Sequence, residues 1–281
     1  MEILINGKPA DIKFDTEKTL GEVISGIELW ISATGNRIRK ICLDGSDIAG
    51  EGLDAAFDRD IKDIRKLEFT LSFFSELAIE ALLELDDTCG LYAGASLEER
   101  RVIADAWEKS AAARFLASDI SDICKLASDC FAGSGLSVRE LKTLLEERLS
   151  ELSDPLLVIS GAETLVKNIC LRMEELPLDM QTGKDQRAAE TIQLFSGIGE
   201  KLFRILFIFK SEGLSMDTFL IEELPVRSFM DEFNRTLDEI SDAYKNRDTV
   251  LAGDIAEYEL APRLLKFYEA LRNIKISDFR V

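Results

Sequence analysis

The sequence contains no histidine, and this absence removes many routes to enzyme chemistry. Without an imidazole in 281 residues, the chain cannot form a Ser-His-Asp triad or a Cys-His pair. Zinc or di-iron sites with histidine ligands and a histidine pH switch are excluded as well. Its five cysteines include no CxxC pair, and they lie singly on apolar stretches, which is typical of buried thiols in a reducing compartment. We expect a protein that is not an enzyme and that holds no metal or cofactor.

Long apolar runs are also missing, and no N-terminal leader is expected. The longest apolar run, residues 205–209, is far too short to span a bilayer. The first four residues have no basic segment and begin a strand pattern directly, which a secretory signal would not do. These features predict a cytoplasmic protein that does not bind membranes.

Positive charge is scarce relative to negative charge. The chain carries 34 Lys and Arg against 53 Asp and Glu, a net charge of −19. Such a chain repels nucleic acid and anionic membrane, so a basic protein partner is easier to accommodate than a polyanion. Residues 1–74 hold 10 basic and 14 acidic side chains, leaving 24 and 39 for the rest. This asymmetry suits a protein whose two parts face different partners.

The first 14 residues predict a β-hairpin. Alternating apolar residues at 3–5 and at 12–14 indicate two strands, with Phe14 near the end of the second, and Asn6-Gly7 between them is a typical hairpin turn. Proline cannot donate to a sheet ladder, so Pro9 predicts that the second strand is an edge strand or begins after it.

A helix and two more strands complete this region. Thr19 and Glu22 have the spacing of a capping box and open an amphipathic helix, which Gly35 is placed to end. Apolar stretches at 38–43 and 67–73 predict the third and fourth strands.

This order, strand–strand–helix–strand–strand, with the Asn6-Gly7 hairpin, resembles the β-grasp (ubiquitin-like) fold, which includes the sulfur-carrier proteins of cofactor synthesis. The resemblance implies a β-grasp domain over residues 1–74. Carrier chemistry in that family needs a free C-terminal Gly-Gly, whereas residue 74 runs into a helix and the chain ends Asp278-Phe279-Arg280-Val281. The resemblance therefore implies a recognition or docking module.

From residue 75 onward the apolar spacing is helical, which predicts an all-helical domain over 75–281 and an α+β protein overall. Ser153-Asp154-Pro155 marks a helix start that can divide this domain into 75–152 and 153–281. Four long helices after residue 153 fit an antiparallel bundle. Pro177 is expected to follow the end of the first, Leu224-Pro225 to begin the third, and Pro262 to kink the fourth.

Residues 202–209 are apolar on almost every face and are interrupted only by Arg204. A helix that is apolar all round is typical of the buried centre of a bundle, which is the favoured interpretation. An exposed groove for a partner is the alternative.

Two sets of polar residues are candidate binding sites. Asp254 and Glu257, three apart beside Tyr258, share a helix face and could form half of a metal site or an acid/base pair. Because the Glu-x-x-His element of di-iron bundles is excluded, structural pairing or partner contact is the favoured interpretation.

The second set, Arg37, Arg39 and Lys40, is a small basic patch at the third strand. It could dock an acidic surface, including the helical half of this protein. A solvated strand end is the simpler interpretation.

Three functional hypotheses follow. The first is a non-enzymatic cytoplasmic adaptor or scaffold, based on the missing catalytic groups and the two-part architecture. The second is an acidic helical chaperone for an export or flagellar substrate, which an exposed apolar groove between helices would favour. The third is a carboxylate-based, metal-dependent enzyme around Asp254 and Glu257, which requires those carboxylates to converge in a pocket.

Overall fold

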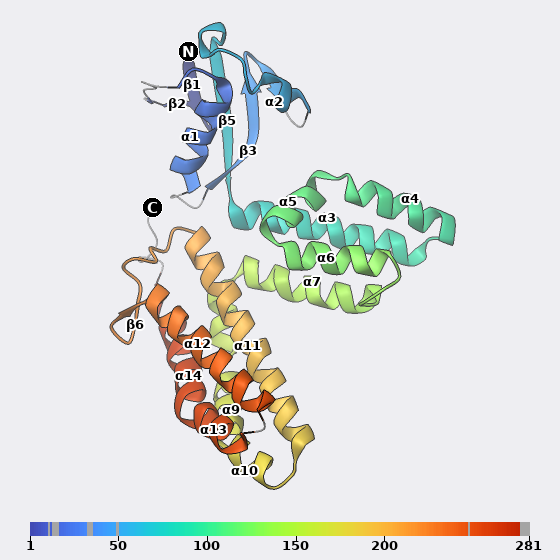
Figure 1. The fold of residues 1–281 in the computed structure, drawn as a ribbon. Coiled ribbons are helices and arrows are strands. Elements are labelled where there is room, and N and C mark those ends of the chain that lie inside the picture. The colour runs from blue at the N-terminus through green and yellow to red at the C-terminus, as the bar shows by residue number, and fades with distance from the viewer. Residues whose placement is uncertain (11, 13–16, 33–35, 49–50, 247, 276–281) are drawn as a thin grey trace. The chain divides into compact units, whose positions relative to one another are not determined.

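The computed structural model is an α+β structure in which a small mixed sheet precedes a long series of helices (Figure 1). It describes the whole chain except residues 11, 13–16, 33–35, 49–50, 247 and 276–281. The chain divides into two compact units, residues 1–153 and residues 154–281. The domain boundaries expected at residues 74 and 152 stay predictions.

Unit 1 begins with a five-stranded sheet in the order β2-β1-β5-β3-β4. The strands are β1 (Glu2–Ile5), β2 (Lys8–Pro9), β3 (Asn36–Leu43), β4 (Ser46–Ile48) and β5 (Lys66–Phe73). β1 and β5 are parallel, and the other neighbours are antiparallel. Asn6 and Gly7 form the hairpin turn with φ of 49° and 74°, and Pro9 lies on the edge strand β2. The turn and the position of Pro9 confirm the sequence predictions.

Helix α1 (Leu20–Ser32) packs on the sheet, and the helix and the sheet together form a hydrophobic core. The Thr19 Oγ1 accepts from the Glu22 N–H at 3.3 Å and the Glu22 Oε2 accepts from the Thr19 N–H at 3.2 Å, so the predicted capping box is formed. Leu20, Leu67 and Phe69 are fully buried between the helix and the sheet. The short helices α2 (Glu51–Ala56) and η1 (Ile61–Asp63) connect the strands. Phe14 and Gly35, which were expected to lie in a strand and to end α1, are outside the described residues.

The rest of unit 1 is helical. Its helices are α3 (Phe74–Gly94), α4 (Leu97–Glu108), α5 (Ala111–Asp119), α6 (Ser121–Phe131) and α7 (Val138–Ser153). α3 packs against both α5 and α7. The Tyr92 hydroxyl donates to the Phe131 carbonyl at 2.9 Å, and the two rings lie 4.8 Å apart between centroids.

Unit 2 is a helical assembly with one small hairpin. Its helices are α8 (Pro155–Gly161), α9 (Glu163–Glu174), α10 (Leu176–Gln181), α11 (Asp185–Ser211), α12 (Val226–Lys245), α13 (Thr249–Asp254), the π-helical η2 (Ile255–Leu260) and α14 (Ala261–Arg272). Pro177 follows the end of helix α9 at Glu174, as expected. It lies in the first turn of α10, where its missing N–H leaves no intrahelical bond unmade.

The hairpin of β6 (Leu220–Ile221) and β7 (Leu224–Pro225) corrects one expectation. Leu224-Pro225 belongs to a strand, and the helix begins only at Val226. The turn consists of Glu222 and Glu223, with φ of 53° and 67°. This left-handed backbone is typical of a two-residue hairpin turn but is usually occupied by Asn or Gly.

At Pro262, where the sequence predicts a kink, a π-helical turn precedes the proline. The Ala261 N–H donates to the Ala256 carbonyl, five residues earlier, instead of the usual four. Pro262 lies in the first turn of α14. Prolines and π-helical turns are both recognised causes of a kink in a helix.

Candidate functional site

Two apolar cavities follow one another between helices α11 and α12 of unit 2. The first, of about 610 Å³, is lined mainly by the N-terminal half of α11 and the C-terminal half of α12. The second, of about 370 Å³, is lined by the C-terminal half of α11 and the N-terminal half of α12. The two helices therefore run antiparallel, and we call the two cavities, together with the α11 and α12 surfaces between them, the groove.

The lining of this groove is mostly hydrophobic. The first cavity is lined by Met173, Ala189, Ile192, Gln193, Phe195, Ser196, Leu237, Ile240, Ser241, Tyr244, Lys245 and Leu260. The second is lined by Phe203, Leu206, Phe207, Lys210, Met216, Met230 and Asn234. Apolar lining with a few polar groups is typical of sites that bind an apolar or amphipathic ligand.

Buried residues of neighbouring helices form the floor of the first cavity. Met173 of α9 and Leu260 of η2 are each 1% exposed. Between the cavities, the rings of Phe203 on α11 and Phe233 on α12 meet edge to face, with centroids 5.6 Å apart. These rings hold the walls together, because the aromatic pair spans the space between the two helices.

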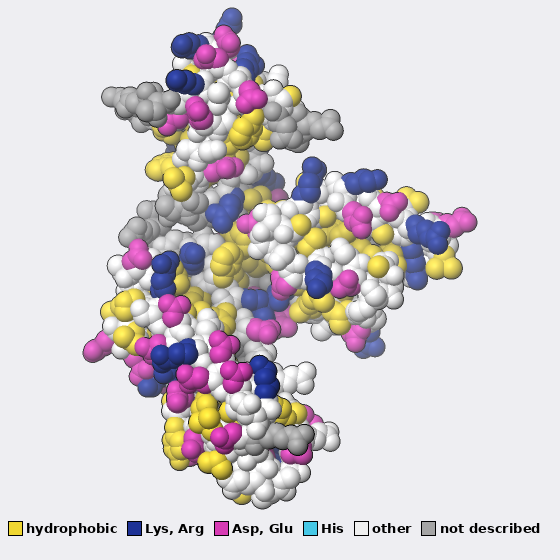
Figure 2. Space-filling model, viewed as in Figure 1, with side chains coloured by type: hydrophobic (Ala, Val, Ile, Leu, Met, Phe, Trp, Pro, Cys, Tyr) yellow, Lys and Arg dark blue, Asp and Glu magenta, His cyan; other side chains and the backbone are white. Residues whose placement is uncertain are grey.

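The rim of the groove is polar and open to solvent. Gln193, Ser196 and Ser241 are exposed, and Tyr244 is 48% exposed. Lys245 pairs with Asp242 at 3.2 Å. Figure 2 shows yellow hydrophobic side chains exposed among magenta acidic ones on the visible face of unit 2. The groove is thus an apolar surface bordered by polar side chains.

The apolar stretch at 202–209 contributes to both the core of unit 2 and the lining of the groove. Leu202, Ile205 and Phe209 are buried in the core of unit 2, as the favoured interpretation predicts. Phe207 is 43% exposed and lines the second cavity together with Phe203. One face of this stretch therefore packs in the core, and another face lines the groove. In the described part of the chain, no helix is both long and apolar enough to cross a membrane.

The basic patch of β3 lies against helices of the same unit. The Arg37 Nε lies 3.8 Å from the Asp119 carboxylate of α5, and its guanidinium carbon lies 5.9 Å from the centroid of the Phe74 ring. Arg39 pairs with Glu80 of α3 at 3.0 Å. Arg37 and Arg39 are therefore both engaged by acidic residues on helices of the same unit.

The third member of the patch stays within the sheet. The Lys40 Nζ lies 2.8 Å from the Asp47 carboxylate on the neighbouring strand β4. The hydrogen bond to Asp47 raises the pKa of this ammonium. Lys40 is thus held as a cross-strand ion pair on the sheet surface.

Asp254, Glu257 and Tyr258 lie at the π-helical turn and do not line the groove. Asp254 and Tyr258 are exposed and Glu257 is half-buried. A hydrogen bond with Glu257 raises the pKa of the Tyr258 hydroxyl. The contribution of this segment to the groove is Leu260 in the floor. Among the residues that the structure describes, no group of three or more Cys, Asp and Glu side chains is arranged to hold a metal ion.

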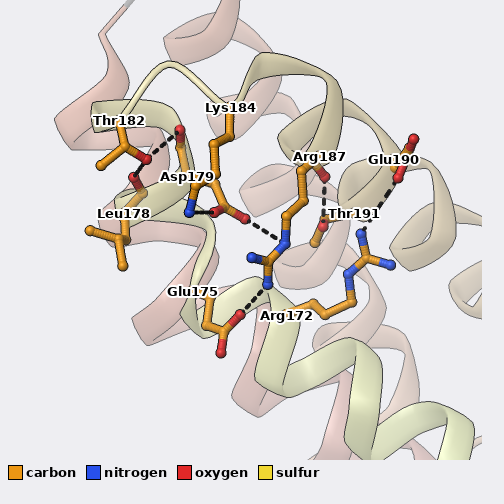
Figure 3. A network of polar contacts seen from close by, with 9 residues as sticks. All are labelled: Arg172, Glu175, Leu178, Asp179, Thr182, Lys184, Arg187, Glu190 and Thr191. Carbon is orange, nitrogen blue, oxygen red and sulfur yellow. Dashed lines mark hydrogen bonds and ion pairs between the residues drawn. The ribbon is translucent and has the colours of Figure 1, made fainter.

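A separate polar network joins α9, α10 and α11 (Figure 3). Asp179 is only 2% exposed; its carboxylate accepts a hydrogen bond from Lys184 at 3.3 Å and forms an ion pair with the Arg187 Nε at 3.1 Å. Arg187 also pairs with Glu175. Because a buried carboxylate is retained only with partners of this kind, the network is structural and fixes the start of α11 against α10.

The sequence predicts a groove only as the alternative for residues 202–209, and it does not predict the first cavity, because the apolar residues there have the same helical spacing as core residues. Ile192, Leu237 and Ile240 were expected only as parts of a filled bundle. The available signal was Ser196 and Ser241, which are exposed on the same helix faces as these apolar residues. Side chains this small and polar do not fill the space between the two helices.

Comparisons with known families assign no activity to the groove. Residues 1–72 match the family model described as the TP0873 N-terminal domain. Residues 158–270 match a domain of unknown function (DUF8042), and this segment contains both walls and the floor of the groove. No match was found to a curated protein or to a solved structure. The chain is therefore similar to two separate family models, one over the sheet and one over the groove.

Proposed function

We propose that this chain is a non-enzymatic cytoplasmic adaptor that binds a protein partner in the groove between α11 and α12. The observation that carries the proposal is the pair of apolar cavities, about 610 and 370 Å³, that open between two antiparallel helices. Grooves of this kind accept the apolar face of a helix. Each apolar side chain that becomes fully buried there would contribute about 1.5–3 kcal/mol before the cost of ordering the partner.

The N-terminal sheet gives the adaptor a second contact surface. We infer a β-grasp domain here, supported by the order β2-β1-β5-β3-β4, the parallel central pair of β1 and β5, and the helix α1 packed on the sheet. α1 carries Leu29 and Trp30, which are 78% and 56% exposed. Exposed aromatic and aliphatic side chains side by side are typical of protein-binding surfaces.

The groove can be blocked without disturbing the core. Ser196 is exposed and lines the first cavity, so Ser196→Trp fills the groove from its rim. Ser118, an exposed serine on α5, provides the matched control Ser118→Trp. Circular dichroism of both variants checks that each is folded.

Tagged wild-type chain and both variants are then purified from the source cells, and co-purified proteins are identified by mass spectrometry. We expect a partner that is retained by the wild type and by Ser118→Trp and is lost with Ser196→Trp. If Ser196→Trp retains the same partners as the wild type, or if the wild type retains none, the proposal is wrong.

The openness of the groove also favours a second candidate, a chaperone for an export or flagellar substrate. Such a chaperone holds one client and prevents its aggregation, whereas an adaptor holds two partners at once. Light scattering of the isolated partner separates these functions. Suppressed aggregation at a one-to-one ratio supports the chaperone, and a stable ternary complex supports the adaptor.

A further inference from the structure

Two exposed carboxylates border the groove without a partner. Glu200 on α11 and Asp238 on α12 are exposed, and neither makes an ion pair or hydrogen bond within the described part of the chain. Three other acidic groups of α12 are paired within the chain, whereas Asp231 is also exposed and has no partner among the described residues. Glu232 pairs with Arg263 at 3.1 Å and Glu239 with Arg235 at 3.7 Å.

Helical spacing places both free carboxylates between the two cavities. Glu200 is four residues after Ser196 of the first cavity and three before Phe203 of the second. Asp238 is four residues after Asn234 of the second cavity and three before Ser241 of the first. Residues three and four apart share a helix face, so each wall carries one carboxylate at the border of the groove, between the two cavities.

The distance between the two cavities determines how far apart the apolar side chains of a bound helix must lie. Along the two walls, the cavity centres are about 9 to 13 residues apart, which is about 13–20 Å at the rise of an α-helix. Eleven residues span about 16 Å and three helical turns, and they return to nearly the same face. An α-helix with apolar side chains eleven residues apart can therefore reach both cavities.

From the proposed binding function and these positions, we infer that the partner is an amphipathic helix with two apolar anchors about three turns apart and one or more Lys or Arg between them. The anchors fill the two cavities and supply the affinity. The basic residue lies between Glu200 and Asp238, where the charges are complementary. Because exposed ion pairs add little affinity, their contribution is to select a basic helix over an acidic one.

The probe is a fluorescein-labelled synthetic helix of 20 residues, with Leu and Phe anchors eleven residues apart and two arginines between them. A second peptide replaces both arginines by glutamate, and a third scrambles the anchors. Binding to the full chain is measured by fluorescence anisotropy. We expect the arginine peptide to bind about tenfold more tightly than the glutamate peptide, and the scrambled peptide not to bind. The preference for arginine should weaken as salt increases.

Two protein variants test the residues themselves. The double variant Glu200→Lys, Asp238→Lys should reverse the preference between the arginine and glutamate peptides. Asp105→Lys, a charge reversal at an exposed position on α4 of unit 1, is the matched control and should preserve the preference. Ser196→Trp should abolish binding of both peptides.

The outcomes separate this inference from the proposed function. Equal binding of the two charged peptides, or an unchanged preference in the double variant, overturns the inference that the partner helix is basic. Failure of all peptides to bind overturns the amphipathic helix, while the proposed function stands if Ser196→Trp still loses its cellular partner. Retention of that partner by Ser196→Trp overturns the proposed function instead.

Discussion

The carboxylate of Asp179 lies 3.1 Å from the Nε of Arg187 and is 2% exposed, whereas the arginine side chain is 44% exposed. The acid comes from the short helix α10 and the base from the first turn of α11 (Figure 3). A buried acid thus fixes the beginning of the helix that forms one wall of the groove.

Replacing Asp179 by asparagine should destabilise the chain. The change removes the negative charge that Lys184 and Arg187 share and leaves a buried amide in its place. We expect the free energy of unfolding to fall by about 1–3 kcal/mol, measured by urea denaturation. The control Glu175→Gln alters the exposed partner of Arg187 and should cost about 0–1 kcal/mol. If both changes lower the free energy of unfolding equally, the burial of Asp179 is not the cause of the destabilisation.

The turn at Glu222 and Glu223 predicts a stabilising substitution. Glu223→Gly removes a Cβ from a residue with φ of 67°, and relief of this left-handed strain should add about 1 kcal/mol to the free energy of unfolding. Glu222→Gly relieves a similar strain but also removes the ion pair with Lys266, so its gain should be smaller. Thermal unfolding of the two variants measures this order, and the reverse order would contradict it.

Two glycines of unit 2 should respond to alanine with opposite signs. A Cβ built on Gly253 would lie 2.8 Å from the Pro177 Cβ and 3.1 Å from its Cα. Gly253→Ala should therefore cost about 1–3 kcal/mol through overpacking. Gly197 on α11 has open space at this position, so Gly197→Ala should stabilise the helix by about 0.5–1 kcal/mol. Denaturant midpoints of the two variants provide the measurement, and two changes of the same sign would refute the packing argument.

The buried thiols predict a loss of stability at alkaline pH. Desolvation raises the pKa of Cys89 from 9.0 to about 12 and that of Cys170 from 9.0 to about 11. Above pH 9 the unfolded thiols ionise while the folded ones keep their protons, so the native state binds more protons and its stability falls as pH rises. The limiting slope is about 1.4 kcal/mol per pH unit for each thiol.

Urea denaturation between pH 8 and pH 11 measures this slope. In Cys89→Ala the fall should be less steep than in the wild type, because one thiol no longer contributes. Cys42, which is only half-buried, provides the control variant Cys42→Ala. Identical slopes in the wild type and Cys89→Ala would show that this thiol does not drive the loss.

Local signals in the sequence predicted the elements that depend on local chemistry. Asn6-Gly7 and the Thr19–Glu22 capping box form as expected, because both act over three or four residues of backbone. The strand β4 and the Glu222-Glu223 hairpin were missed. Two glutamates are not a turn signal, and only the surrounding structure holds them at positive φ.

The groove could not be predicted for a different reason. Helical spacing shows which side of α11 and α12 is apolar, but it does not show how far apart the two helices lie. That separation depends on contacts that are distant in sequence, such as the rings of Phe203 and Phe233. The candidate sites named from sequence were clusters of charge. They lie on the sheet and on the π-helical turn, where they pair locally or face solvent.

Each wall of the groove ends in a lysine, Lys210 at the end of α11 and Lys245 at the end of α12, where a cation complements the helix dipole. Because the walls are antiparallel, these lysines occupy opposite ends of the groove. The two lysines therefore give a helix in this groove no preferred polarity. The unequal cavities, about 610 and 370 Å³, supply the asymmetry, so the bulkier anchor of a ligand determines which way its N-terminus points.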